Sequence, residues 1–110
     1  MKQLLTTAAL SLAVATAAQA APVKVGMITT LSGGGASLGV DIRDGFMLAV
    51  KQAGNPDLSV VVEDDARKPP MAVQIADKMI QQEKVDILTG IVWSNLAMAV
   101  VPSAVAQGKF

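Results

Sequence analysis

The stretch Val23-Lys24-Val25-Gly26-Met27-Ile28, followed by Leu31-Ser32-Gly33-Gly34-Gly35-Ala36-Ser37-Leu38-Gly39, decides the fold of this chain. The first segment is a short apolar run typical of a buried strand, and the glycines after it predict a tight loop. Apolar residues then recur at helical spacing, at Leu38, Ile42, Phe46, Ala49 and Val50. A strand, a glycine-rich loop and a helix in this order begin an open α/β sheet, in which ligands bind at the carboxyl ends of the strands.

The rest of the chain repeats this unit. Further strands are expected at 58–62 and 85–90, and helices from Pro69-Pro70 to about residue 81 and from Ser94 or Asn95 to about Gln107. This alternation predicts an α/β fold with a doubly wound, Rossmann-like parallel sheet. Residues 107–110 read as a helix stop and the start of another strand, so we interpret the sequence as a fragment whose isolated helices expose apolar faces.

Three details of the helices follow from the residue types. Ser37 is expected to cap the first helix, because serine side chains accept hydrogen bonds from free N–H groups at that position. Gly45 inside the same helix predicts close packing against the sheet. In the second helix, a buried stripe is expected at Met71, Ile75, Met79 and Ile80, which we interpret as ordinary core.

Residues 1–20 have the features of a secretory signal peptide. Lys2 supplies a positive end, an apolar segment runs from Leu4 to Ala18, and Ala18-Gln19-Ala20 provides a cleavage site of small residues. A membrane anchor is the alternative, but the apolar segment is shorter than the roughly 20 residues that cross a bilayer. The sequence has no cysteine to carry a lipid. We therefore expect residues 21–110 to be exported to the periplasm and not to insert directly into the membrane after cleavage.

Composition argues against several classes of function. The chain has nine basic and nine acidic residues and no histidine, so no basic surface for nucleic acid and no histidine-based catalytic or zinc site is expected. The glycine-rich loop lacks the spacing of both dinucleotide and phosphate-loop motifs. It remains open whether this loop cradles a small polar ligand or is only a permissive turn. The acidic residues Glu63-Asp64-Asp65 are expected to end a strand, to accept hydrogen bonds from the following turn and to stay solvated, so we predict no metal and no cofactor.

Trp93-Ser94-Asn95 is the most informative group of candidate ligand-binding residues. Ser94 lies where the third helix begins, so its hydroxyl and the free N–H groups of Asn95 and Leu96 can together bind a carboxylate. Trp93 can supply an apolar or stacking wall. A plain helix cap at Ser94 and a packing role for Trp93 are the alternatives that these residues alone leave open.

A set of short segments in this chain recurs together in a known family. These segments are Lys24-Val25-Gly26-Met27, Leu31-Ser32-Gly33, Leu38-Gly39, Asp44-Gly45 to Ala49-Val50, Val62-Glu63-Asp64-Asp65-Ala66, Pro69, Ala72-Val73 and Val85-Asp86-Ile87-Leu88-Thr89-Gly90. With them, essentially all of residues 21–110 resembles the amino-terminal part of periplasmic substrate-binding proteins of the leucine/isoleucine/valine-binding type, which serve ABC importers.

The resemblance implies a two-lobed protein that closes on its ligand like a hinge, with residues 21–110 forming part of the amino-terminal lobe. It implies that Ser94 contacts a ligand carboxylate and that Trp93 lines the pocket. The family often places an aromatic ring at the position of Leu38, which leaves an amino acid and an aromatic carboxylate both as candidate ligands. With Asn95 and Ser37, these residues are the candidate ligand-binding residues.

The expected function is therefore non-enzymatic capture of a small carboxylate and its delivery to an ABC permease in the inner membrane. A ligand-sensing module of a membrane receptor with the same fold is the alternative. An exported enzyme has little support, because histidine and cysteine are absent and the nucleotide motifs fail.

Overall fold

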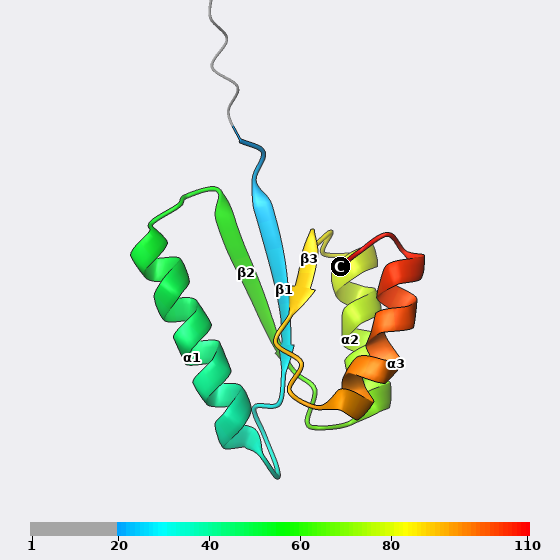
Figure 1. Cartoon of the computed structure of the whole chain (residues 1–110). Helices are drawn as coiled ribbons and strands as arrows, with labels where there is room; N and C mark the ends of the chain where they lie inside the picture. Colours follow the sequence, from blue (N-terminus) through cyan, green and yellow to red (C-terminus); the bar gives the residue numbers. More distant parts are fainter. Residues whose placement is uncertain (1–19) are drawn as a thin grey trace, which may run out of the picture.

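The computed structural model describes residues 20–110, which form three strands and three helices in strict alternation (Figure 1). The elements are β1 (Val23–Thr29), α1 (Ala36–Ala53), β2 (Leu58–Asp64), α2 (Pro69–Gln81), β3 (Ile87–Thr89) and α3 (Ser94–Ala106). This order confirms the predicted α/β fold. The predicted signal peptide lies outside the described residues except for Ala20. None of the helices in the described part is long and apolar enough to cross a membrane.

The strands form one parallel sheet with β1 in the centre, in the order β2-β1-β3. Val25 of β1 is in register with Val60 of β2 and with Ile87 of β3. Because all three strands run in the same direction, their carboxyl ends meet at one edge of the sheet, at the bottom of Figure 1. The loop that follows each strand therefore starts at that edge.

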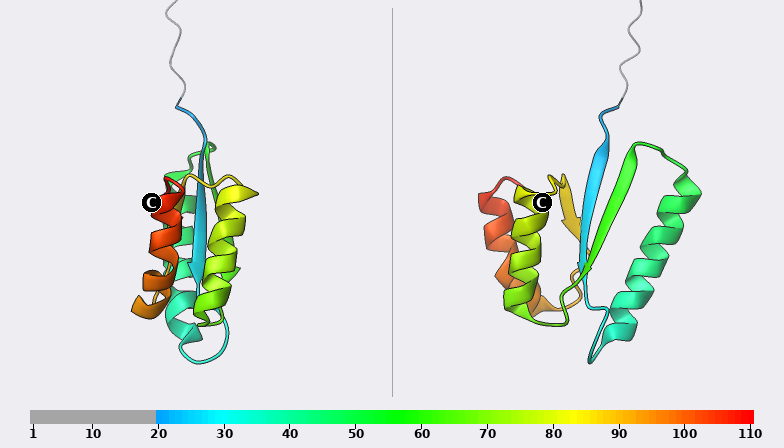
Figure 2. Two further views of the ribbon diagram at one scale, coloured as in Figure 1. Left: turned by 90° about the vertical axis from the view of Figure 1, so that its right-hand side faces the viewer. Right: turned by 180° about the vertical axis from the view of Figure 1, so that it is seen from behind.

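The core lies where α2 and α3 pack together beside β1, as the views in Figure 2 show. Ile75, Met79 and Ile80 are buried as predicted. Met71 is 36% exposed, and Ala72 is buried in its place. The buried stripe thus follows the spacing 72, 75, 76, 79 and 80, which leaves Met71 at the edge of the helical face that turns inward.

Helix α1 contacts the sheet at its first turn and is otherwise largely exposed. Gly39 is its one buried residue, and a Cβ added there would overlap the carbonyl oxygen of Thr30. The predicted close packing of Gly45 is wrong, because that residue is exposed and no neighbouring element comes within 4 Å of the position that a Cβ would take. The close approach of helix and strand that we assigned to Gly45 occurs at Gly39 instead.

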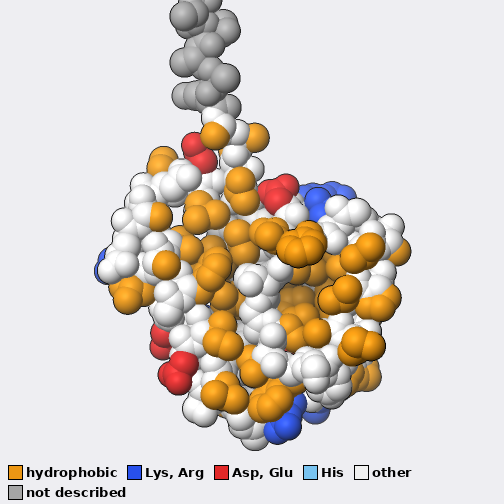
Figure 3. All heavy atoms as spheres, in the orientation of Figure 1, with side chains coloured by type: hydrophobic (Ala, Val, Ile, Leu, Met, Phe, Trp, Pro, Cys, Tyr) orange, Lys and Arg blue, Asp and Glu red, His pale blue; other side chains and the backbone are white. Residues whose placement is uncertain are grey.

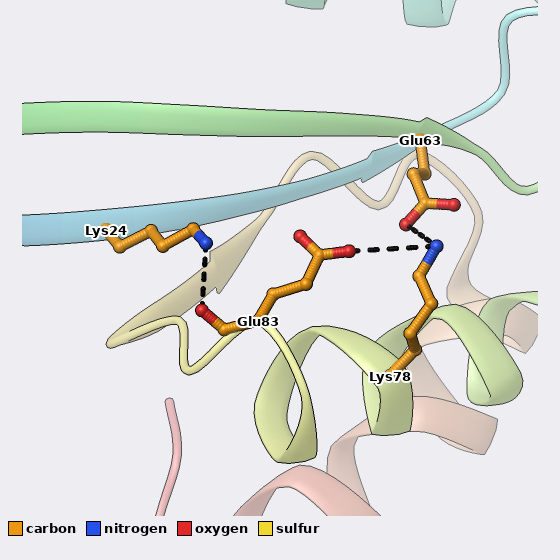
Figure 4. A network of polar contacts seen from close by, with 4 residues as sticks. All are labelled: Lys24, Glu63, Lys78 and Glu83. Carbon is orange, nitrogen blue, oxygen red and sulfur yellow. Dashed lines mark hydrogen bonds and ion pairs between the residues drawn. The ribbon is translucent and has the colours of Figure 1, made fainter.

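Polar contacts of Lys24 and Lys78 connect α2 and the residues after it to the sheet, as Figure 4 shows. Lys78 forms ion pairs with Glu63 of β2 and, at 3.7 Å, with Glu83 after α2. The hydrogen bond with Glu63 is the main cause that raises the pKa of Lys78. Lys24 of β1 donates from Nζ to the carbonyl oxygen of Glu83 at 2.8 Å. These contacts hold β1, β2 and the end of α2 in one arrangement.

Apolar side chains are prominent on the face shown in Figure 3. The most exposed ones near the carboxyl end of the chain are Met98 at 77%, Val105 at 62% and Phe110 at 88%. The Phe110 carbonyl oxygen accepts a 2.7 Å hydrogen bond from the Leu88 N–H, so the last residue pairs with β3. The expected apolar exposure of the helices is confirmed.

Candidate functional site

Three segments that are far apart in the sequence meet at the carboxyl edge of the sheet. They are the loop after β1, the turn after β2 and the segment between β3 and α3. Trp93, from the third of these, is half-buried and contacts the other two. Its indole ring is therefore the point at which the three segments meet.

A chain of hydrogen bonds connects Trp93 to the residues that directly follow β1 and β2. Its indole Nε1 donates to Thr30 Oγ1 at 2.9 Å, and Thr30 Oγ1 lies 2.6 Å from Asp65 Oδ1. An indole N–H can only donate and a carboxylate can only accept, so the Thr30 hydroxyl accepts from Trp93 and donates to Asp65. Thr30 and Asp65 are both fully buried. The indole edge is thus anchored to a rigid part of the core.

Two further groups restrict the indole ring. The Arg67 guanidinium carbon lies 3.8 Å from the ring centroid, which is cation–π geometry. In the loop after β1, a Cβ at Gly35 would overlap the Cζ2 atom of Trp93. Gly35 also has a φ of 88°, a conformation that residues with a side chain adopt only with strain. A glycine is therefore required at this point of the loop.

Asp64 fastens the loop after β1 to the turn after β2. Its carboxylate accepts hydrogen bonds from the Leu31 N–H and the Ala66 N–H, both at 2.8 Å, and from the Ser32 hydroxyl. Desolvation by burial raises the pKa of Asp64, but these hydrogen bonds together outweigh it and lower the pKa below its ordinary value. The charged form of Asp64 therefore stabilises the loop.

The turn after β2 has an unusual backbone that places Arg67 over Trp93. Ala66 and Arg67 have φ angles of 48° and 58°, which cost energy in residues with a side chain. Asp64 and Asp65 each accept a hydrogen bond from the N–H two residues further on, a pattern that supports tight turns. The predicted hydrogen bonds from this turn to the acidic residues are confirmed for Asp64 and Asp65. The expectation that all three acidic residues stay solvated is wrong, because Asp65 is fully buried.

The start of α3 provides the polar groups next to Trp93. Ser94 is the first residue of the helix, and both Ser94 and Asn95 are exposed. Trp93 itself occupies the N-cap position, with no side-chain capping bond. The Leu96 N–H, predicted to be free, donates to the Trp93 carbonyl oxygen at 3.1 Å. The N–H groups of Ser94 and Asn95 have no earlier turn to pair with and are the ones available to an anion.

The other predicted site residues lie on the first turn of α1. Leu38 is 49% exposed and Ser37 is exposed. Ser37 does not cap the helix, which begins one residue earlier at Ala36 with Gly35 as its N-cap. The left-handed conformation of Gly35 turns the chain into the helix before Ser37 is reached. Both side chains follow directly on the loop that contacts Trp93.

Thr30, Asp65 and Arg67 were missed as site residues in the sequence. The available signal was that polar residues follow two strands, at Thr29-Thr30 and at Asp64-Asp65, since parallel strands bring such residues to one edge. No group of acidic side chains in residues 20–110 is arranged to hold a metal ion.

Comparison with known families shows the family of this chain. The model of the periplasmic binding protein family matches residues 22–110. The chain belongs to this family. A search of curated proteins gave no significant match.

Solved structures of periplasmic binding proteins share the fold. A solute binding protein of an ABC transporter from Rhodopseudomonas palustris, in complex with benzoate, is 40% identical with a TM-score of 0.72, over 81% of this chain and 26% of that one. An ABC transporter substrate-binding protein from Sphaerobacter thermophilus is 31% identical with a TM-score of 0.74, over 80% and 25%. The branched-chain amino acid transporter substrate binding protein LivJ from Streptococcus pneumoniae, in complex with isoleucine, is 27% identical with a TM-score of 0.74, over 79% and 27%. The chain thus spans about a quarter of the length of these structures.

Proposed function

We propose that this chain is part of the amino-terminal lobe of an extracytoplasmic solute-binding protein, which captures a small carboxylate and delivers it to an ABC permease in the inner membrane. Residues 1–20 act as the signal peptide that brings it to the periplasm. The ligand is bound by closure of two lobes, without a chemical reaction and without a cofactor. Membership in the periplasmic binding protein family and the names of the similar structures support this role.

The observation that carries the proposal is the anchored Trp93 beside the exposed start of α3. The Ser94 hydroxyl and the N–H groups of Ser94 and Asn95 bind the ligand carboxylate, where the helix dipole also favours negative charge. The indole of Trp93 provides a fixed flat wall for the apolar part of the ligand. Leu38 and Ser37, on the first turn of α1, border the same edge.

The ligand classes to test follow from the similar structures. One of them holds benzoate and another holds isoleucine, and both ligands combine a carboxylate with an apolar body. We propose that the ligand of this protein has the same two parts.

Calorimetric titration of the complete gene product with benzoate and with leucine tests the proposal. Ser94→Ala is expected to weaken binding of the better ligand at least about tenfold, because a hydrogen bond to a charged group contributes about 1.5 to 3 kcal/mol. Ser59→Ala, at an exposed position on β2, is the matched control and should leave the dissociation constant unchanged. Equal affinities for the wild type and Ser94→Ala would remove Ser94 from the site.

A further inference from the structure

We infer that Arg67 makes the Trp93 site select ligands with net negative charge, so that a carboxylate without an ammonium group binds better than a zwitterionic amino acid. The inference rests on the proposed function and specifies its ligand class. The role of Arg67 follows from its position over Trp93, from its lack of an ion-pair partner among residues 20–110 and from the hydrogen bonds that the nearby aspartates already accept.

The guanidinium of Arg67 is not neutralised within the part of the chain that the structure describes. No carboxylate of residues 20–110 forms an ion pair with it, whereas Arg43 and Lys78 are both paired. Its hydrogen bond to the Gly34 carbonyl oxygen measures 3.5 Å, which is at the long limit for such a bond. Arg67 is also exposed, so most of its N–H groups face solvent.

The two acidic residues at this edge, Asp64 and Asp65, accept hydrogen bonds from other groups of the protein. Asp64 accepts from Leu31, Ser32 and Ala66. Asp65 accepts from Thr30 and from the Arg67 N–H, and its side chain is fully buried. The other Asp65 oxygen, Oδ2, has no hydrogen-bond partner in the described part of the chain but is buried, so it is closed to an ammonium group that comes from solvent. Of the charged side chains at this edge, the exposed guanidinium of Arg67 is the one that lies over Trp93.

The stacking geometry gives this charge a fixed place. The guanidinium carbon lies 3.8 Å from the centroid of the indole ring, and N–H groups of a guanidinium held in this way can donate to a ligand carboxylate. The turn that holds Arg67 there contains two residues with positive φ, and such strained positions persist only where surrounding contacts enforce them. Here the contacts are the hydrogen bonds from the N–H groups of Ala66 and Arg67 to the two aspartates.

An ammonium group brought to the same edge would be repelled by the guanidinium of Arg67, and the hydrogen-bonded Asp64 and the buried Asp65 offset this repulsion only in part. A benzoate-like ligand has no ammonium group and meets no such repulsion, and its carboxylate has one oxygen for the guanidinium and one for the N–H groups at the start of α3. The net charge of the ligand thus distinguishes zwitterionic amino acids from benzoate-like anions, although both have a carboxylate and similar size.

The test compares Arg67→Gln with Lys68→Gln in the complete gene product. Lys68 is the adjacent residue and is also exposed, so both variants remove one positive charge from the same turn. The probes are benzoate, its neutral analogue benzamide, and leucine, each titrated by calorimetry. Thermal melts and far-UV circular dichroism establish that each variant retains its fold.

We expect wild-type protein to bind benzoate at least about tenfold more tightly than leucine or benzamide. Arg67→Gln should weaken benzoate binding about tenfold or more and narrow its advantage over leucine, whereas Lys68→Gln should change it less than about twofold. Arg67→Lys, which keeps the charge but loses the planar fork, should give an intermediate affinity.

Other results overturn the inference. Tighter binding of leucine than of benzoate by the wild type would contradict it while leaving the transport function intact. Equal losses of benzoate affinity in Arg67→Gln and Lys68→Gln would show a general effect of positive charge and not a specific role for Arg67. Failure of the wild type to bind either carboxylate would instead count against the proposed function itself.

Discussion

The indole Nε1 of Trp93 lies 2.9 Å from Oγ1 of Thr30, 63 positions earlier in the chain. This hydrogen bond joins the segment before α3 to the end of β1, and Thr30 extends the connection to the buried Asp65. A residue that lines the proposed binding site is thus held by the core of the sheet. The arrangement provides a wall that is in place before a ligand arrives, which lowers the entropic cost of binding.

Replacement of Thr30 by valine keeps the shape of the side chain and removes both hydrogen bonds. We expect Thr30→Val to lower the free energy of unfolding by about 2 kcal/mol more than Thr30→Ser does, because Asp65 then loses a donor in a buried position. Urea unfolding of both variants measures this difference. The fluorescence of Trp93 should change in Thr30→Val and stay close to that of the wild type in Thr30→Ser. Equal stabilities for the two variants would show that the hydroxyl of Thr30 does not support Trp93.

Replacement of each of the two glycines of α1 by alanine is predicted to change the free energy of unfolding in opposite directions. Gly39→Ala places a methyl group against the backbone of Thr30, so we expect a loss of about 2 kcal/mol or more in the free energy of unfolding. Gly45→Ala meets no neighbouring element and should raise it by up to about 1 kcal/mol, because alanine favours helix. Thermal or urea melts of both variants check the pair. A stabilising Gly39→Ala would mean that α1 is not packed on β1 as described.

Acid should open the loop after β1. The pKa of Asp64 is lower in the folded state than the ordinary 3.8, so the unfolded state binds protons more readily. The stabilisation from this group is complete above pH 3.8 and is lost as the pH falls through the lower folded-state pKa. We expect the free energy of unfolding to fall more steeply with acid below about pH 4 in the wild type than in Asp64→Asn. Parallel pH profiles for the two proteins would contradict the role of Asp64.

The order of elements and the edge that carries the site could be predicted from the sequence, because both follow from short-range patterns. β-branched runs, glycine loops and the proline start of α2 act locally, and the parallel topology then determines which loops meet. Trp93 and Ser94 are candidates from the sequence because Ser94 lies where the third helix begins and Trp93 directly precedes it, and their role in binding stays a prediction.

The contacts within the site could not be predicted in this way. The hydrogen bond from Trp93 to Thr30 and the stacking of Arg67 on Trp93 join residues that are distant in the sequence and depend on the exact path of each loop. A glycine inside a helix is conspicuous in the sequence, which favours Gly45 as the point of close packing. The approach of Gly39 to Thr30 depends instead on the direction of α1 relative to β1. The burial of Asp65 likewise depends on the left-handed turn at Ala66 and Arg67.

The proposed function depends on binding of a small carboxylate against Trp93. The NMR signal of the Trp93 indole N–H reports this binding most directly, in the complete gene product, assigned with Trp93→Phe and followed during titration with benzoate. We expect this signal to shift and to saturate with the dissociation constant found by calorimetry. Binding of benzoate that leaves the Trp93 signal unchanged would show that the ligand does not bind against Trp93.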